Sequence, residues 1–435
     1  MPPPTDQRHL PNEITDHIID HLWDDKLTLA ICTHVSKNWL PSVRLHLFRS
    51  LVWEDRLEDG KAYGFKDLVK SLESCPAIGS CVENLALVRG ADPYRLPEQH
   101  PWLCEITLRW IMTKLPRLRS MKLDSVYLGD GDIDPYHDIC FRAPPTSELP
   151  RLKLDSLELI GVGNPEGDLK RIYGFFHVFE SIGRLSIDTL EWNSGCNHED
   201  EAILKGLSYR SPIPSLQISS LAVHNEHWLA NLLDHLLPMI QVESVEMLEF
   251  MCHDWDDLDA ASDLANKIGS NLKALTFNPT EAIWEKVNNE DDEDDIHHPL
   301  PQGEWRRLFF EKCSSLQQIK VVLDLVNQSH YRGAIDPHLI CYALDIFSEC
   351  PPTIVHATLR LNFDGVSPEP AFQCIDWPRF RTVLQAWKGL RRVTIYIYHK
   401  QGSLIRDREL KLLLEMELKV VNDGLEIIIT DNVHD

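Results

Sequence analysis

The pattern closest to a ligand-binding motif is a glycine-containing segment in the middle of the chain. Three glycines, Gly161, Gly163 and Gly167, follow a predicted strand at 154–160 and precede a predicted helix. Such a turn can cradle a phosphate with backbone N–H groups at a helix N-terminus. The spacing is one residue too long for the dinucleotide-binding pattern, however, and Glu166 brings a negative charge into the turn. We therefore predict no nucleotide site here.

Two other sets of residues have side chains that bind metals. His224, Glu226 and His227 lie together at a predicted strand end, without a clear further ligand. Cys75 and Cys81 have no second cysteine pair, which a zinc site built from cysteines requires. The sequence also lacks the short motifs typical of serine hydrolases, P-loop nucleotidases and zinc peptidases. We predict no metal, no cofactor and no enzymatic activity.

An acidic segment at 287–302 contains six consecutive acidic residues, 290–295. Like charges repel one another, so such a run does not fold alone. A calcium-binding loop needs alternating ligands and a central glycine, which this run lacks. We interpret the segment as a solvated loop.

Charge and composition exclude several classes of partner. The 435-residue chain has a formal net charge of -24, whereas surfaces that bind nucleic acid or anionic membranes are basic. The N-terminal residues lack the apolar segment of a signal peptide, and no run is long enough to span a bilayer. The 11 cysteines are scattered, as expected for reduced thiols. These features predict a cytoplasmic or nuclear protein that binds neither nucleic acid nor membrane.

The elements that could position a binding surface begin near the N-terminus, with three amphipathic helices predicted in 10–51. Pro11 suits the first turn of the first helix, Asp24 and Asp25 can cap the second, and Pro41 restarts the chain for the third. The apolar positions at helical spacing are Ile14, Ile18, Ile19 and Leu22, then Leu29, Cys32, Val35 and Trp39, then Leu40, Val43, Leu47 and Leu51. So small a unit cannot bury all of this apolar surface itself, and what remains outside would mark a docking face.

This segment resembles an F-box, most closely the form common in fungal F-box proteins. The matching motifs are Leu10-Pro11-x-Glu13-Ile14, Ile18-Ile19-x-x-Leu22, Leu29-x-x-Cys32-x-x-Val35-x-x-x-Trp39-Leu40-Pro41 and Arg44-x-x-Leu47-Phe48-Arg49-Ser50. They cover roughly a tenth of the chain. The resemblance implies binding to a Skp-type adaptor, and through it to a cullin, in an SCF ubiquitin ligase. It places the adaptor-binding residues at Leu10, Pro11, Ile14, Ile18, Leu22, Trp39 and Leu40. The alternative is an ordinary helical cap on the domain that follows.

From residue 65 onward, a weak repeat alternates helical patterns with short apolar strands. The expected helices include 65–74, 169–180 and 406–420. The strands fit Leu-x-x-Leu-x-Leu with aliphatic substitutions, and they begin at Leu118, Leu154, Ile182, Ile218, Val245, Leu272, Leu316 and Leu390. Looser copies lie at 82–88, 353–363 and 424–430. Each unit exposes an apolar side that only the next unit can cover, so the units are expected to stack into a solenoid with a parallel sheet.

The repeat resembles an irregular leucine-rich repeat domain, with departures. Start-to-start spacing varies, from 27 residues between Ile218 and Val245 to 44 between Leu272 and Leu316. The asparagine that normally follows the last leucine is mostly absent, and Asn278 is its best approximation. A globular α/β domain with similar buried strands is the alternative.

The predicted fold class is therefore α/β, with an N-terminal three-helix F-box followed by an irregular leucine-rich-repeat-like solenoid. The expected organisation is a disordered tail at 1–9, the F-box at 10–51, a linker at 52–64, the repeat domain at 65–430 and a tail at 431–435. The predicted function is substrate recognition in an SCF ubiquitin ligase, with an unknown protein substrate held by the repeats. The alternative function is a non-catalytic, protein-binding repeat scaffold with no ubiquitin-ligase role.

Overall fold

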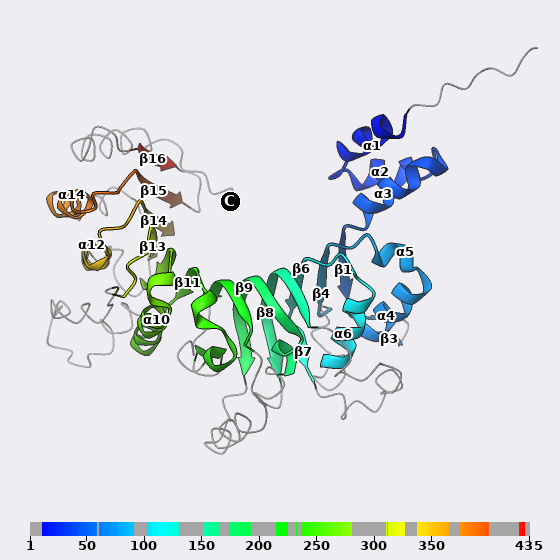
Figure 1. Cartoon of the computed structure of the whole chain (residues 1–435), viewed down its shortest axis with the longest axis horizontal. Helices are drawn as coiled ribbons and strands as arrows, with labels where there is room; N and C mark the ends of the chain where they lie inside the picture. Colours follow the sequence, from blue (N-terminus) through cyan, green and yellow to red (C-terminus); the bar gives the residue numbers. More distant parts are fainter. Residues whose placement is uncertain are drawn as a thin grey trace, which may run out of the picture. The chain divides into compact units, whose positions relative to one another are not determined.

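A computed structural model shows the architecture of the chain (Figure 1). It describes residues 11–58, 61–90, 102–129, 151–164, 174–192, 215–224, 232–233, 236–280, 310, 312–326, 337–364, 375–399 and 426–430. The chain divides into two compact units: unit 1 comprises Met1–Ile182 and Thr189–Pro214, and unit 2 comprises Gly183–Asp188 and Ser215–Asp435.

Unit 1 opens with helices and continues as alternating strands and helices. Its elements are α1 (Asn12–Asp20), α2 (Lys26–Cys32), the 3-10 helix η1 (Lys37–Trp39), α3 (Leu40–Leu47), β1 (Ser50–Glu54), β2 (Arg56–Glu58), β3 (Lys61–Tyr63), α4 (Phe65–Ser74), α5 (Pro76–Gly79), β4 (Asn84–Val88), β5 (Trp102–Leu103), α6 (Glu105–Thr113), β6 (Ser120–Asp124), β7 (Tyr127–Leu128) and β8 (Leu152–Asn164). The long strand β9 (Phe179–Trp192) contributes its two ends to unit 1 and its middle to unit 2.

Unit 2 repeats the alternation of strand and helix. Its elements are β10 (Gln217–His224), η5 (Leu237–Met239), η6 (Val242–Ser244), β11 (Met247–Met251), α10 (Trp255–Ile268), η7 (Gly269–Asn271), β12 (Ala274–Asn278), β13 (Gln318–Val326), α12 (Pro337–Glu349), β14 (His356–Asp364), α14 (Trp377–Ala386), β15 (Arg392–His399) and β16 (Glu426–Thr430).

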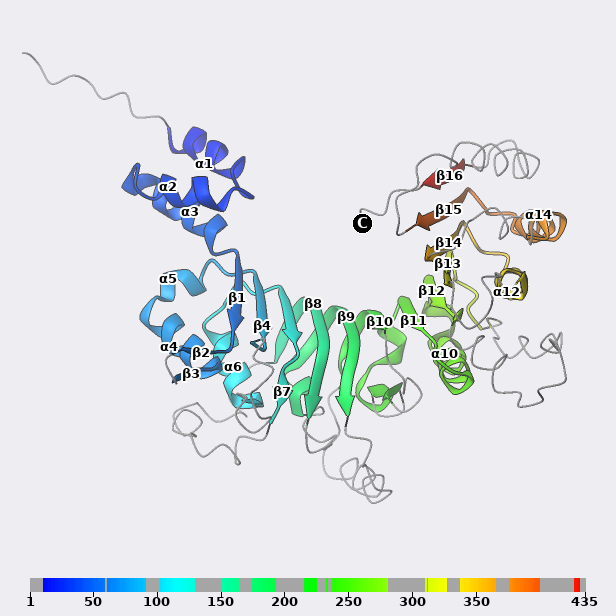
Figure 2. The same cartoon turned by 180° about the vertical axis from the view of Figure 1, so that it is seen from behind.

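The strands form a parallel sheet whose order follows the sequence, as predicted. In unit 1 the order is β1-β4-β6-β8, with β7 also paired to β8, and in unit 2 it is β10 to β16 in sequence (Figure 2). In the described residues, the only antiparallel pair is the hairpin β2–β3. Each strand reaches its neighbour through an intervening segment rather than a hairpin, which is what parallel pairing requires.

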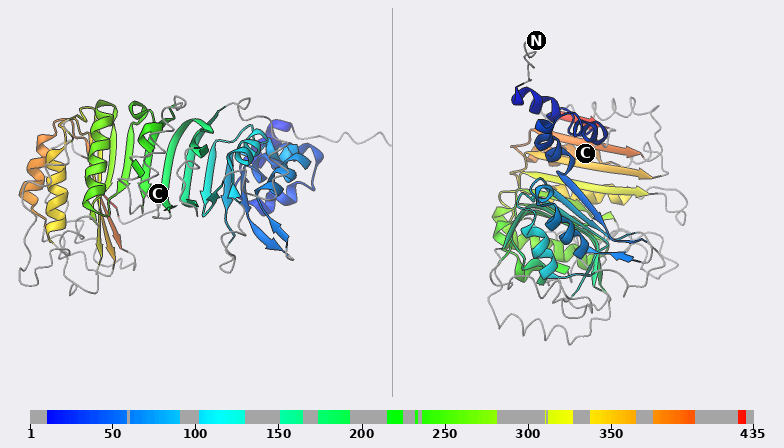
Figure 3. Two further views of the ribbon diagram at one scale, coloured as in Figure 1. Left: turned by 90° about the horizontal axis from the view of Figure 1, so that it is seen from below. Right: turned by 90° about the vertical axis from the view of Figure 1, so that its right-hand side faces the viewer.

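The alternating pattern of the strands decides which side is buried. The second and third apolar positions of the repeat line up across neighbouring strands, for example Leu85 with Met121 and Leu157 in unit 1, and all three side chains are buried. In unit 2 the same line runs through Leu248, Leu275, Ile319, Ala357 and Val393. Helices cover this face: α4 and α6 in unit 1, and α10, α12 and α14 in unit 2 (Figure 3).

A backbone feature recurs at the start of successive strands. The carbonyl of Arg49 accepts N–H groups from both Glu83 and Asn84, and the carbonyl of Glu83 accepts from both Arg119 and Ser120. In unit 2 the carbonyls of Glu246, Lys273, Gln317 and Val355 each accept two N–H groups in the same way. The strands share one parallel register, each repeat contributes one strand, and the helices lie on one face of the sheet. These features make the fold leucine-rich-repeat-like.

Several sequence expectations differ from the structure in their details. Leu51, expected to end the third helix, lies in β1, because the chain enters the parallel ladder with β4 at Ser50. The segment expected as a linker, 52–64, contains most of β1 together with β2 and β3. A helix expected at 169–180 is helical only at 174–176 in its described part, and β9 already begins at Phe179. The acidic segment 287–302 and the predicted helix at 406–420 lie outside the described residues.

Candidate docking surfaces

The N-terminal helices have a small core of their own. Ile19 from α1, Leu29 and Cys32 from α2 and Val43 from α3 are buried together, and Leu22, Trp39 and Leu47 pack against them. All seven residues come from the helical segment itself. The helices α1 to α3 therefore form a self-contained layer, and none of this core is shared with the sheet.

Polar contacts hold the three helices in place. Asp25 caps α2: its Oδ1 accepts from the Thr28 N–H at 2.9 Å, and the Thr28 hydroxyl donates to Oδ2 at 2.6 Å. These two hydrogen bonds hold the pKa of Asp25 below its ordinary value of 3.8. The Ser42 hydroxyl donates to Asp16, and His46 Nε2 lies 2.7 Å from Asp20 Oδ1, so α3 is tied to α1 twice.

The outer surface of this helical unit carries several large apolar side chains among its polar ones. In the described part of the chain, the large apolar side chains that are clearly exposed are Ile14, Ile18, Trp23, Leu27, Ile31, Val35, Val52 and Met247. The first six all belong to the helical unit, with exposed fractions from 43% for Ile18 to 74% for Leu27. We call these six residues the apolar stripe. Sites of association on proteins are rich in exposed apolar side chains.

The seven residues expected at the adaptor surface divide between the surface and the interior. Pro11, Ile14 and Ile18 are exposed on or beside α1. Leu22 and Trp39 are half-buried against the helical core, and Leu40 is half-buried at the start of α3. Leu10 lies outside the described residues.

Sequence reasoning missed four members of the stripe, Trp23, Leu27, Ile31 and Val35. Leu27 and Ile31 lie four residues apart on α2, and this spacing places side chains on one face of a helix. The helical spacing predicts Val35 on the same apolar face as Leu29, yet Val35 is 59% exposed and lies beyond the end of α2.

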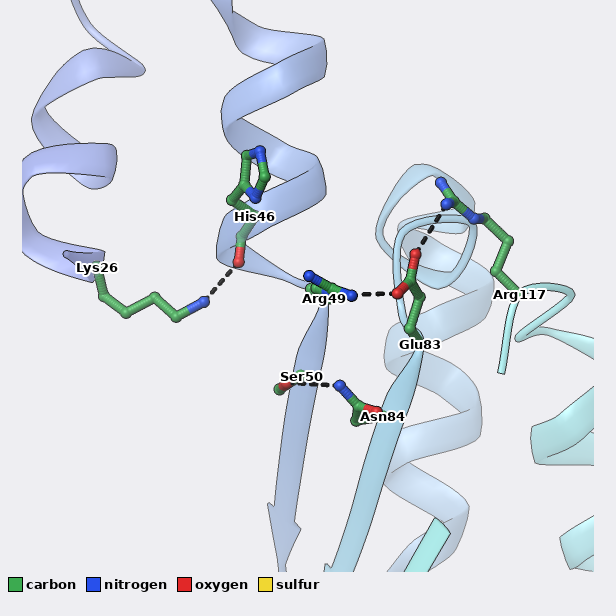
Figure 4. Close-up of polar contacts among 7 residues, drawn as sticks. All are labelled: Lys26, His46, Arg49, Ser50, Glu83, Asn84 and Arg117. Atoms are coloured by element: carbon green, nitrogen blue, oxygen red, sulfur yellow. Dashed lines mark hydrogen bonds and ion pairs between the residues drawn. The ribbon is translucent and has the colours of Figure 1, made fainter. Parts of the chain in front are cut away.

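The helical unit joins the sheet through a short, charged junction (Figure 4). Only Phe48 and Arg49 separate α3 from β1. The carboxylate of Glu83 accepts from Arg49 Nε at 2.9 Å and from Arg117 Nη2 at 2.8 Å. Because these three residues precede β1, β4 and β6, the contacts fasten the starts of three strands. Lys26 adds a hydrogen bond to the carbonyl of His46.

The second candidate surface is the sheet face in unit 2 that no described helix covers. The side chains on this face alternate with the buried positions and are mostly polar, including Glu249, Thr276, Lys320, Thr358 and Arg392. Glu249 forms an ion pair with Arg184 at 3.5 Å, and Arg392 with Glu426 at 2.7 Å. We call it the open face of unit 2.

A hydrogen-bonded row crosses the carboxyl ends of three of these strands. Asn278 Nδ2 donates to Asp324 Oδ2 at 2.6 Å, and Asn362 Nδ2 donates to the other oxygen of Asp324. The Thr280 hydroxyl donates to Asn278 Oδ1 at 2.7 Å. Asn278, the residue that best approximated the repeat asparagine, thus bridges neighbouring repeats through its side chain.

The motifs that suggested small-molecule chemistry form no such site among the described residues. Gly161 and Gly163 lie within β8, and Gly161 has φ of +54° where the strand passes close to Ser125. Gly161 therefore allows a left-handed backbone beside Ser125 within a strand, rather than a phosphate turn. His224 ends β10, while Gly167, Glu226 and His227 lie outside the described residues.

Burial raises the pKa of three of the described cysteines. Cys75 and Cys81 are free, as are the buried Cys252, Cys313 and Cys350. Burial raises the pKa of Cys313 to about 11 and raises the pKa values of Cys252 and Cys350 well above the ordinary value. A nucleophilic cysteine needs a lowered pKa, so these thiols serve packing.

Comparisons with known proteins give a distant likeness only. No protein-family model and no curated protein matches the chain. Among solved structures, it is similar to the leucine-rich repeat-containing protein LegL7 from Legionella pneumophila, with 13% sequence identity and a TM-score of 0.42. The likeness covers 88% of this chain and 91% of that one.

No described helix has the length and apolar character to cross a membrane.

Proposed function

We propose that this protein is the substrate-recognition subunit of an SCF ubiquitin ligase, in which the N-terminal helices bind a Skp-type adaptor. The single observation that carries the proposal is the apolar stripe, because it coincides with the segment whose motifs resemble an F-box. The self-contained core of α1 to α3 supports a docking module over a cap. A cap would bury its apolar residues against the repeats.

In this proposal the repeats hold a protein substrate on the open face of unit 2, and the chain itself performs no chemistry. Its contribution is proximity, because it brings a substrate lysine near the conjugating enzyme that the cullin recruits. The polar side chains on that face, with Met247 exposed at its edge, offer hydrogen bonds and one apolar anchor to such a substrate.

The sharpest test is co-expression with a Skp-type adaptor, followed by size exclusion, for wild type and Leu27→Asp. Leu27 is the most exposed member of the stripe and lies in the first turn of α2, where an acidic residue favours the helix. The substitution therefore leaves the fold intact. Losing a buried leucine contact costs about 1.5–3 kcal/mol, which weakens adaptor binding by about 10- to 100-fold.

Val52→Asp is the matched control, since Val52 is similarly exposed but lies on β1, outside the helical unit. We expect it to leave the adaptor complex intact. If wild type forms no complex, or if Leu27→Asp binds as well as wild type, the ligase role is wrong. The chain would then act only as a binding scaffold.

A further inference from the structure

A pair of histidines on α1 has an arrangement that the docking function does not explain. His17 and His21 are one helical turn apart and both exposed. Their Nε2 atoms are 3.4 Å apart, while the ring centroids are 4.6 Å apart. Because the nitrogens are closer than the centroids, the Nε2 atoms lie on the facing sides of the two rings.

The 3.4 Å between the two Nε2 atoms matches the distance between two nitrogen ligands of one zinc ion. With Zn–N bonds of about 2.0–2.1 Å and tetrahedral angles, two ligand nitrogens are about 3.3–3.4 Å apart. Histidines four residues apart on a helix are a known way to place two imidazoles on one zinc ion. As a hydrogen bond between two neutral rings, the same distance is long, since N–H donors usually reach their acceptors within about 3.2 Å.

The surroundings leave the pair available to a metal. Asp16 and Asp20, the acidic residues between Glu13 and the end of α1, are engaged by Ser42 and His46 of α3. His21 keeps a helical backbone as the C-cap, with φ of -71° and ψ of -13°, so the one-turn spacing is preserved. Among the described residues, no cluster of three or more metal-binding side chains exists. The chain therefore supplies two ligands, and water or a partner supplies the others.

We infer that His17 and His21 form a two-imidazole site for Zn²⁺ on the exposed face of α1. Neutral imidazole is a preferred zinc ligand, and the net charge of -24 draws cations to the protein. Each ring binds through its Nε2 lone pair and keeps its proton on Nδ1.

The site lies beside the apolar stripe. At about 100° per residue, His21 is about 20° from Ile14 around the helix and His17 about 60° from it, while Ile18 is on the other side. A partner that covers Ile14 and Ile18 therefore also covers the zinc, and one of its side chains can complete the coordination. This last step rests on the proposed function, whereas zinc binding by the chain alone does not.

The test is zinc binding by the full-length chain without a histidine tag, measured by equilibrium dialysis and metal analysis. Wild type, His17→Ala and His21→Ala are compared, with circular dichroism confirming that each variant is folded. We expect each variant to bind one equivalent of Zn²⁺ fewer than wild type, because one imidazole cannot hold the ion alone. Alanine favours helix, so α1 is retained.

His34→Ala is the matched control, because His34 is an exposed histidine of the same helical unit, just after α2. It should bind as much zinc as wild type. Equal zinc content in wild type, His17→Ala and His21→Ala would overturn the site, and so would an equal loss in His34→Ala. Since no adaptor is present, failure here is distinct from failure of the ligase proposal.

Discussion

The N-terminal helices and the repeats of unit 2 differ in where they place large apolar side chains. In unit 2 the second and third positions of each repeat are buried under helices, and the uncovered sheet face is polar. In the helical unit a four-residue core is enough to hold α1 to α3 together, and six large apolar side chains stay outside. Repetition explains the contrast, because each repeat covers the next, while the helical unit has no neighbour of its own kind.

The largest effect that separates the two regions concerns stability. Phe277 of β12 is buried and lies against Phe250 of β11, with ring centroids 5.4 Å apart. Phe277→Ala should lower the free energy of unfolding by about 3–5 kcal/mol, because it leaves a cavity in the sheet core. Leu27→Ala, in the stripe, should change it by less than about 0.5 kcal/mol. Urea unfolding of both variants measures the difference. Equal losses in the free energy of unfolding would show that the two regions do not differ in this way.

An intermediate effect is expected at the junction. Glu83→Gln removes the charge that Arg49 and Arg117 share and offers them only one acceptor oxygen. Charge-assisted hydrogen bonds with a buried partner contribute about 1–3 kcal/mol, so urea unfolding should show a loss of that order.

Glu158→Gln is the control for that loss. Glu158 lies 3.7 Å from Lys122, and its side chain is 46% exposed. An exposed pair of this kind contributes about 0–1 kcal/mol. A loss at Glu158 as large as that at Glu83 would show that the junction is no stronger than an ordinary surface pair.

The smallest effect concerns the acidic cap of α2. Hydrogen bonds from Thr28 lower the pKa of Asp25 in the folded protein, so its stabilisation is present above the unfolded value of 3.8 and is lost as the pH falls through the lower folded value. Asp25→Asn keeps a capping oxygen but cannot titrate. We expect the melting temperature of wild type to fall more steeply below pH 4 than that of Asp25→Asn, as followed by circular dichroism. Parallel curves would contradict this.

The sheet could be predicted from the sequence because the apolar pattern of its strands is short and recurs in every repeat. Every Leu-x-x-Leu-x-Leu segment became a strand, and the helix expected at 65–74 is α4, Phe65–Ser74. The short strands β5 and β7 were not foreseen, since two residues carry no alternation to detect. The glycines at 161 and 163 predict a turn, yet both lie in β8. Glycine is permissive both in turns and at left-handed positions within a strand, and composition alone does not separate these uses.

The docking surface was harder to predict for a physical reason. α2 carries two apolar faces, Leu29 with Cys32 and Leu27 with Ile31, and both have helical spacing. Periodicity reports that a face is apolar and leaves open which face meets the core. The His17–His21 pair is likewise visible as a spacing, but the 3.4 Å separation of its Nε2 atoms depends on the side-chain conformations.

The two-residue junction between α3 and β1 also has a mechanical consequence. β1 is paired with β4 over five residues, from Ser50 with Asn84 to Glu54 with Val88. A force applied to the helices along the strand direction would load this ladder in shear, so its hydrogen bonds would resist together rather than one after another. The helical unit is thereby coupled to the sheet through five paired residues rather than through a single contact.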